Sequence, residues 1–289
     1  MIAFEPVCLE HRPDWVIVVG DVNSTVACAL TAKKLGIRVA HVEAGLRSRD
    51  MSMPEEINRL CTDAISDLLF TTDTLAVENL RNEGVASGKI HFVGNTMIDT
   101  LRQQISRARQ LPLPDGLESG QYAVLTLHRP ANVDFPDRLT LIMGAINTIA
   151  DRIPVVFPVH PRTAPRLKEI EMHPRIRIVE PMSYLPFLGL VASSRMALTD
   201  SGGIQEETTV LGVRCLTMRP NTERPITCEI GTNVLVGTDP HRILREANSI
   251  LDGHTRPGAI PEKWDGHAAE RIVDVLLNQA MRAPRLVCV

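Results

Sequence analysis

Aromatic residues are scarce in this sequence, since Phe, Trp and Tyr together make up 3% of its 289 residues. Proteins that hold single-stranded nucleic acids stack the bases on aromatic side chains, so the composition argues against that class of ligand. No block of Lys and Arg stands out, and the formal net charge is −3. We therefore expect no nucleic-acid partner.

Long apolar runs and closely paired cysteines are lacking as well. No run approaches the ~20 apolar residues that cross a bilayer, and the N-terminus has no basic region followed by an apolar one. The six cysteines show no CxxC spacing, and no His/Cys cluster has the spacing of metal ligands. These patterns predict a cytoplasmic protein with no membrane segment and no metal site.

Short apolar runs rich in β-branched residues alternate with helical patterns, which is typical of βα units that build parallel sheets. We expect an α/β fold with two doubly wound domains, because 289 residues suit two domains of ~150 residues each. Strands are predicted in the first series at Trp15–Val19, Val39–Val42, Leu68–Thr71 and Ile90–Val93. Strands are predicted in the second series at Tyr122–Leu127, Val155–Val159, Ile176–Val179, Met196–Thr199, Arg214–Met218 and Asn233–Val236.

The segment 111–120, LPLPDGLESG, combines Pro and Gly without periodicity and predicts an interdomain linker. We expect a first domain over residues 1–114, a second over 115–265, and a C-terminal helix and tail over 266–289 that pack back on the first domain. Four strands face six, so the first domain is expected to lack its initial strand-helix units. The run WVIVV would then form an exposed apolar edge, which natural sheets avoid.

Carboxylates and a histidine directly follow predicted strands of these sheets, where ligands of open parallel sheets bind. Asp21 follows WVIVVG, Glu43 follows VAHV and His128 follows YAVLTL, whereas Glu55 and Glu56 begin a helix. Each has a structural alternative: a helix cap for Asp21, stabilisation of the helix dipole for Glu55 and Glu56, and a satisfied histidine for His128. For Glu43 the alternative is weaker, because a charge directly after a buried strand is costly unless it is used.

The segment TDSGGIQEE, residues 199–207, predicts an anion site in the second domain. A strand ends there and a Ser-Gly-Gly turn opens a helix, so the backbone N–H groups of Gly202 and Gly203 can approach phosphate oxygens. Glu206 or Glu207 could then accept hydrogen bonds from a ribose. A plain tight turn explains a Gly-Gly pair as well, but RPNTERP brings Arg219 and Arg224 to the same edge.

No Gly-x-Gly-x-x-Gly and no Gly-x-x-x-x-Gly-Lys occurs, so dinucleotide and triphosphate chemistry lose support. Eight segments resemble the non-hydrolysing UDP-N-acetylglucosamine 2-epimerase family, in the family's order and across residues from about 13 to 280. They are GDVNST, HVEAGLRS, MPEEINR, VGNTMIDT, LTLHRPANVD, FPVHPRT, TDSGGIQEE and TERP. The resemblance implies a GT-B-type pair of Rossmann-like domains with the active site between them, and a homodimer.

The resemblance also implies roles for individual residues. The family's catalytic carboxylates fall on Asp21, Glu43 and Glu55, and its active-site histidine falls on His128. Its UDP contacts fall on Phe187, Ser201, Gly203, Glu207 and Arg224. The implied reaction inverts C2 of UDP-N-acetylglucosamine by eliminating UDP and adding it back through 2-acetamidoglucal, which needs two acid/base groups and no cofactor or metal.

Other activities remain open on the sequence. A GT-B glycosyltransferase would use the same UDP-sugar cleft, and a non-catalytic remnant would bind UDP through the second domain alone. A hydrolysing relative would release free N-acetylmannosamine. The family begins with a strand and a Gly-Thr-Arg-Pro turn that the sequence lacks, so we expect weak or no activity unless those units are supplied.

Overall fold

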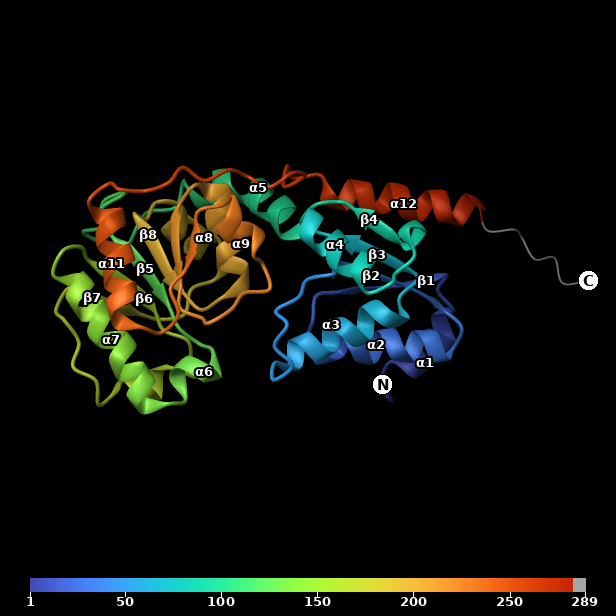
Figure 1. Cartoon of the computed structure of the whole chain (residues 1–289), viewed down its shortest axis with the longest axis horizontal. Coiled ribbons are helices and arrows are strands. Elements are labelled where there is room, and N and C mark those ends of the chain that lie inside the picture. The colour runs from blue at the N-terminus through green and yellow to red at the C-terminus, as the bar shows by residue number, and fades with distance from the viewer. Residues whose placement is uncertain (283–289) are drawn as a thin grey trace, which may run out of the picture. The chain divides into compact units, whose positions relative to one another are not determined.

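The computed structural model describes residues 1–282, and their contacts divide the chain into two compact α/β units (Figure 1). The first unit comprises Met1–Asp99 and the residues from Glu262 onward, and the second comprises Thr100–Pro261. The tail expected beyond residue 282 lies outside the described residues. Within residues 1–282, no helix is long and apolar enough to cross a membrane.

The first unit is built on a parallel four-stranded sheet in the order β1-β2-β3-β4. Its strands are β1 Trp15–Val19, β2 Arg38–Ala44, β3 Leu68–Thr71 and β4 Ile90–Phe92. Its helices are α1 Glu5–His11, α2 Asn23–Lys34, α3 Pro54–Ile65, α4 Thr74–Asn82 and α12 Ala268–Arg282, with a 3-10 turn at Ser87–Lys89 and α5 Thr96–Ala108 leading into the second unit.

The two faces of this sheet bury separate apolar clusters. Val16 and Val18 of β1 pack with Ala29 and Ala32 of α2, while Ile272 of α12 packs on the opposite face. β1 is the outermost strand, and its alternate residues Ile17 and Val19 remain 50% and 55% exposed. The run WVIVV thus has one buried face and one exposed apolar face.

The second unit holds a parallel six-stranded sheet in the order β10-β9-β8-β5-β6-β7. Its strands are β5 Ala123–Thr126, β6 Val155–Pro158, β7 Ile176–Val179, β8 Met196–Thr199, β9 Arg214–Thr217 and β10 Asn233–Leu235. Its helices are α6 Pro130–Val133, α7 Pro136–Ala150, α8 Tyr184–Ala192, α9 Gly202–Leu211, α10 Ile226–Glu229 and α11 Pro240–Leu251, with a 3-10 turn at Ala164–Leu167. The predicted α/β class with two parallel sheets of four and six strands is confirmed.

Helices cover both faces of the second sheet. α7 and α11 bury Ile146, Ile243 and Ala247 in the largest apolar cluster. On the other face, Leu113 and Leu117 from the segment 111–120 pack against a cluster that contains Tyr122. The segment 111–120 therefore packs within the second unit, which begins at Thr100.

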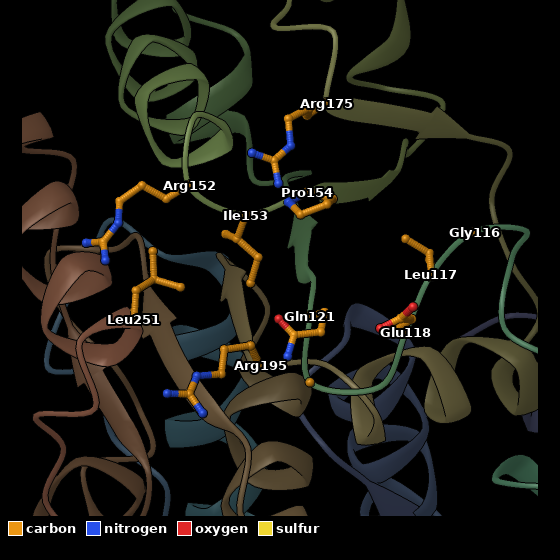
Figure 2. Close-up of a pocket in the computed structure, with 11 residues that line it drawn as sticks. Gly116, Leu117, Glu118, Gln121, Arg152, Ile153, Pro154, Arg175, Arg195 and Leu251 are labelled. Carbon is orange, nitrogen blue, oxygen red and sulfur yellow. The ribbon is translucent and has the colours of Figure 1, made fainter.

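The two ends of this sheet carry different cavities. The carboxyl ends of β5, β6 and β8 border a cavity of about 260 Å³, which includes His128 and Ser201. The amino ends border a larger cavity of about 650 Å³, lined by arginines (Figure 2). The first lies where ligands of open parallel sheets bind.

Candidate active site

Asp21 lies in a sharp turn at the carboxyl end of β1. Gly20 takes the left-handed conformation, with φ +68°, and its N–H donates to the carbonyl of Val42 at 3.0 Å. The side chain of Asn58 donates to the Asp21 carbonyl at 2.8 Å. The helix-cap alternative for Asp21 is wrong, because the N-cap residue of α2 is Val22 and the start of this helix has no side-chain cap hydrogen bond.

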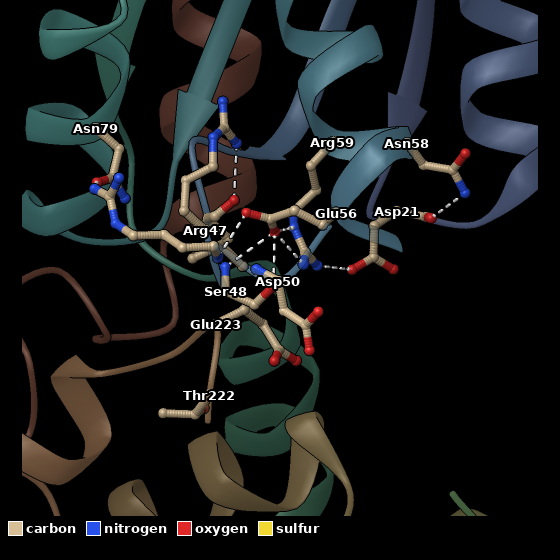
Figure 3. Close-up of polar contacts among 12 residues, drawn as sticks. Asp21, Arg47, Ser48, Asp50, Glu56, Asn58, Arg59, Asn79, Thr222 and Glu223 are labelled. Atoms are coloured by element: carbon tan, nitrogen blue, oxygen red, sulfur yellow. Dashed lines mark hydrogen bonds and ion pairs between the residues drawn. The ribbon is translucent and has the colours of Figure 1, made fainter. Parts of the chain in front are cut away.

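The carboxylate of Asp21 instead meets Arg59 of α3, as Figure 3 shows. The Arg59 side chain is 1% exposed and pairs with both Asp21 and Glu56, the latter at 2.6 Å. Glu56 also accepts from the backbone N–H groups of Ser48 at 2.9 Å and Arg49 at 2.8 Å. Burial acts to raise the pKa of Glu56, yet the hydrogen bonds from Ser48, Arg59 and Arg49 outweigh it and lower that pKa.

Glu43 has the most unusual backbone among the predicted catalytic residues. Its φ of +72° is the left-handed conformation, which a side chain other than glycine adopts at a cost of about 1–3 kcal/mol. The pairing of β2 with β3 shifts register between Val42 and Ala44, so Glu43 is a bulge. Its Oε2 atom lies 3.5 Å from the position of a Cβ added to Gly20. The bulge therefore turns the carboxylate of Glu43 towards the turn that carries Asp21.

Glu55 and Glu56 separate in role although they are neighbours on α3. Glu56 is buried, at 2% exposure, and its oxygens are occupied by Ser48, Arg49 and Arg59. Glu55 is only partly buried and follows Pro54 at the first turn of the helix. The buried Glu56 holds the loop before α3, and Glu55 is the carboxylate of the pair that solvent or a ligand can reach.

A buried network that the sequence analysis did not identify supports the same turn. His41 of β2 is fully buried, with Nδ1 2.6 Å from Asp63 and Nε2 2.9 Å from the Gly20 carbonyl. The two ring nitrogens thus lie against two different elements, the Asp63 carboxylate of α3 and the Gly20 carbonyl at the end of β1. Asp63 also pairs with Arg47 at 2.7 Å and accepts from the Gly45 N–H at 3.1 Å.

The charges of this network compensate each other inside the unit. Burial acts to raise the pKa of Asp63, but His41 and Arg47 outweigh it and hold that pKa below its usual value. Arg47 in turn pairs with Glu83 at 2.6 Å. The only sequence indication of this network was a histidine inside the apolar run VAHV.

In the second unit, His128 lies at the carboxyl end of β5 and lines the 260 Å³ cavity with Phe187 and Ser201. Its Nδ1 is 2.8 Å from the carboxylate of Asp200, which is fully buried and also accepts from the backbone N–H groups of His128 and Arg129. Burial acts to raise the pKa of Asp200, and the bonds from His128 outweigh it and lower that pKa. The structure thus brings three predicted residues of the second domain to one cavity.

The Ser-Gly-Gly turn opens α9, with Ser201 as its cap residue. A Cβ added to Gly202 would lie 2.6 Å from Nη1 of Arg224 and 2.8 Å from Oε1 of Glu223, so a larger side chain would displace the guanidinium. Arg224 pairs with Glu206 at 2.9 Å and also with Glu223. Gly202 and Arg224, both predicted site residues, therefore lie next to each other at the start of α9.

Glu207, one turn further along α9, is nearly buried and accepts from the Tyr184 hydroxyl at 2.9 Å. Burial raises the pKa of Glu207, and the Tyr184 hydrogen bond offsets this only in part. Glu206 is committed to Arg224. Of the two carboxylates considered from the sequence, Glu206 pairs with a guanidinium and Glu207 bonds to a hydroxyl. Tyr184 is a neighbour that the sequence did not indicate.

Comparison with known proteins shows the family to which this chain belongs. A family model described as UDP-N-acetylglucosamine 2-epimerase matches residues 1–277. The chain belongs to the UDP-N-acetylglucosamine 2-epimerase family. Within residues 1–282, no group of three or more His, Cys, Asp and Glu side chains could hold a metal ion.

Individual members of the family are similar over most of the chain. The UDP-N-acetylglucosamine 2-epimerase of Methanocaldococcus jannaschii is 42% identical over 294 residues, which cover 96% of this chain and 78% of that protein. The UDP-2,3-diacetamido-2,3-dideoxy-D-glucuronate 2-epimerase of Pseudomonas aeruginosa is 42% identical over 282 residues, with 96% and 78% covered. The crystal structure of the M. jannaschii enzyme in complex with UDP-GlcNAc and UDP superposes with a TM-score of 0.86 at 43% identity and covers 96% of this chain and 79% of that one.

Proposed function

We propose that this protein inverts C2 of UDP-N-acetylglucosamine and so forms UDP-N-acetylmannosamine. Membership of the epimerase family supports the reaction class. The observation that carries the assignment of residues is the strained Glu43, whose carboxylate is turned towards the Gly20–Asp21 turn. Such strain persists at functional sites, because the surrounding packing must hold it in place.

The proposed reaction breaks the C1–O bond to UDP and removes the C2 hydrogen as a proton, which gives 2-acetamidoglucal and UDP. UDP then adds back at C1 while a proton is delivered to the other face of C2. One carboxylate takes the proton and a second group on the opposite face supplies one, so at least two acid/base groups are needed. Asp21, Glu43 and Glu55 are the candidates.

The second unit would bind the UDP moiety. Phe187 and Ser201 line the cavity at the carboxyl ends of the strands, and the N–H groups of Gly202 and Gly203 suit phosphate oxygens at the start of α9. Glu207 would accept hydrogen bonds from the ribose. His128 and Arg224 would stabilise the negative charge that builds on the departing diphosphate.

Incubation with UDP-N-acetylglucosamine in deuterated water tests the proposal. An epimerase incorporates deuterium at C2 and forms the manno epimer with no acceptor present, and both products are visible by NMR. A Glu43→Gln variant should lose the exchange, while Glu78→Gln, on α4, should keep it. If UDP shifts the melting temperature but no exchange occurs, the chain is a UDP-binding protein without this activity. If turnover needs an acceptor, it is a glycosyltransferase.

A modified sugar is the second candidate substrate, because the P. aeruginosa relative, named for a diacetamido-glucuronate, is as similar as the M. jannaschii one. A carboxylate at C6 and an acetamido group at C3 distinguish the two sugars. Parallel measurements of kcat/KM with both nucleotide sugars decide between them. Light scattering tests the expected homodimer in the same preparations.

A further inference from the structure

The 650 Å³ cavity lies at the amino ends of the strands of the second sheet, the opposite end from His128 and Ser201. Its lining comes from the residues that precede β5, β6, β7 and β8, from the segment Gly116–Gln121, and from Leu251 at the end of α11. Each of these strands has four residues, so about 13 Å of sheet separates the two cavities. The volume lies within the ~300–1,000 Å³ of small-molecule sites.

Three arginines line this cavity, and Figure 2 shows Arg152, Arg175 and Arg195 spaced around it, with Glu118 at the right of the view. Arg175 donates to the backbone carbonyl of Asp151 at 3.0 Å, and Arg195 donates to that of Ile250 at 3.1 Å. Within residues 1–282, neither Arg175 nor Arg195 has a carboxylate within ion-pair distance. The backbone carbonyls thus fix the direction of each guanidinium without neutralising it.

The neighbourhood adds further positive charge. Arg177 donates to the carbonyl of Asp115 at 2.5 Å, and its Nη2 lies 3.5 Å from the position of a Cβ on Gly116, at the wall of the cavity. Burial, together with the charges of Arg256 and Arg195, lowers the pKa of Arg214. Arg152 is the lining arginine that is neutralised, by Asp252 at 2.6 Å. At this end of the sheet, the arginines therefore carry more positive charge than the neighbouring carboxylates neutralise.

We propose that this cavity is a second ligand site, for a small molecule that carries two or more phosphate groups. Guanidinium groups form bidentate hydrogen bonds with phosphate oxygens, and two forks that are already oriented lose little freedom on binding. Leu117, Ile153 and Leu251 provide an apolar surface beside the arginines for an organic part of the ligand. Glu118, the acidic residue of the lining, suits a hydroxyl donor on that part.

Titration of the 289-residue protein with inorganic pyrophosphate, followed by calorimetry, tests the site. The double variant Arg175→Gln/Arg195→Gln should weaken one class of pyrophosphate site at least tenfold, because two charge-assisted hydrogen bonds to phosphate oxygens are lost. The matched control Arg242→Gln/Arg245→Gln removes two exposed arginines from α11 that do not line the cavity, and should bind as the wild type does. Indistinguishable isotherms for the wild type and the cavity variant would overturn the proposal.

Two further measurements keep the result clear. The first is thermal melting: all four arginines are exposed, so both variants should melt within about 2 °C of the wild type. The second is salt dependence: the affinity of the wild-type cavity for pyrophosphate should fall steeply between 50 and 500 mM salt. Binding that is insensitive to salt contradicts an arginine site. Citrate serves as the carboxylate probe: if it binds more tightly than pyrophosphate at this cavity, the ligand class is wrong. None of these outcomes depends on epimerase activity.

Discussion

Arg59 of α3 and Asp21 at the end of β1 form a charged contact across 38 positions of sequence. The guanidinium is buried and shared with Glu56, so the helix and the turn are fixed relative to each other through one side chain. Asp21, 26% exposed, keeps one side towards solvent. Arg59 is therefore a positioning residue for the proposed catalytic carboxylate.

Arg59→Lys should lower kcat about 10- to 100-fold and leave KM for the nucleotide sugar nearly unchanged. Lysine keeps the charge but cannot bridge two carboxylates, and one charge-assisted bond is worth about 1.5–3 kcal/mol. The proposed UDP contacts lie in the second unit and are not altered. Arg81→Lys, an exposed position on α4, is the control. An unchanged kcat in a folded Arg59→Lys protein would contradict the positioning role.

The strands could be predicted because buried parallel strands are continuous apolar runs bounded by polar turns. β1, β3, β7 and β8 have the expected bounds. The predicted site residues also followed from position, since residues after parallel strands meet at one sheet edge. His128 and Ser201 share a cavity for that reason, whereas Phe187, on α8, was indicated by the family resemblance alone.

The network behind the turn could not be predicted, because its members are far apart in sequence and their roles depend on partners. His41 is an ordinary member of an apolar run until Asp63 and the Gly20 carbonyl face its two nitrogens. The left-handed backbone of Glu43 also depends on a register shift between β2 and β3, which single-strand patterns do not contain. The segment 111–120 has the composition of a linker, yet it packs through Leu113 and Leu117.

Asp63→Asn should remove part of the pH dependence of stability. The pKa of Asp63 is lowered in the folded protein, so the unfolded state binds more protons in acid, and the stability that Asp63 provides is lost as the pH falls below about 4. Urea unfolding at pH 3–7 should show a smaller acid slope for Asp63→Asn and a lower free energy of unfolding at pH 7. Asp137→Asn, at an exposed position of α7, should keep the wild-type slope. Equal slopes for Asp63→Asn and the wild type would contradict this assignment.

Gly202→Ala should weaken UDP binding at least tenfold and also lower the melting temperature, because the buried pairs of Arg224 with Glu206 and Glu223 are disturbed. The added methyl group would meet Arg224 at 2.6 Å, so the guanidinium must move from the start of α9. Gly144→Ala is the matched control, because no atom lies within 4 Å of its added Cβ and it is inside α7. Alanine there should stabilise the protein by up to about 1 kcal/mol. Calorimetry with UDP and thermal melting measure both effects. Equal UDP affinities for Gly202→Ala and the wild type would refute the proposed phosphate site at the start of α9.

Glu207→Gln should make the protein more stable at pH 7 and bind UDP more weakly. Burial raises the pKa of Glu207, so the folded state holds the proton more tightly, and stability falls as the pH rises above the unfolded value of about 4.3. A neutral glutamine removes that cost but also the acceptor proposed for the ribose. Glu169→Gln, at an exposed position, should change neither quantity. A Glu207→Gln variant that keeps full UDP affinity would remove Glu207 from the site.

Ile17→Lys should reduce self-association without lowering the free energy of unfolding by more than about 0.5 kcal/mol. Ile17 is 50% exposed on the outermost strand, and such an edge combines apolar side chains with backbone groups that can pair with another chain. A lysine there repels a second edge and remains solvated. Val273→Lys, at 52% exposure on α12, adds the same charge where the backbone is already bonded within a helix, so it should reduce association less. Dynamic light scattering over a concentration series measures the association of each variant. If Ile17→Lys and Val273→Lys reduce association equally, exposed apolar surface drives it and the strand edge has no special role.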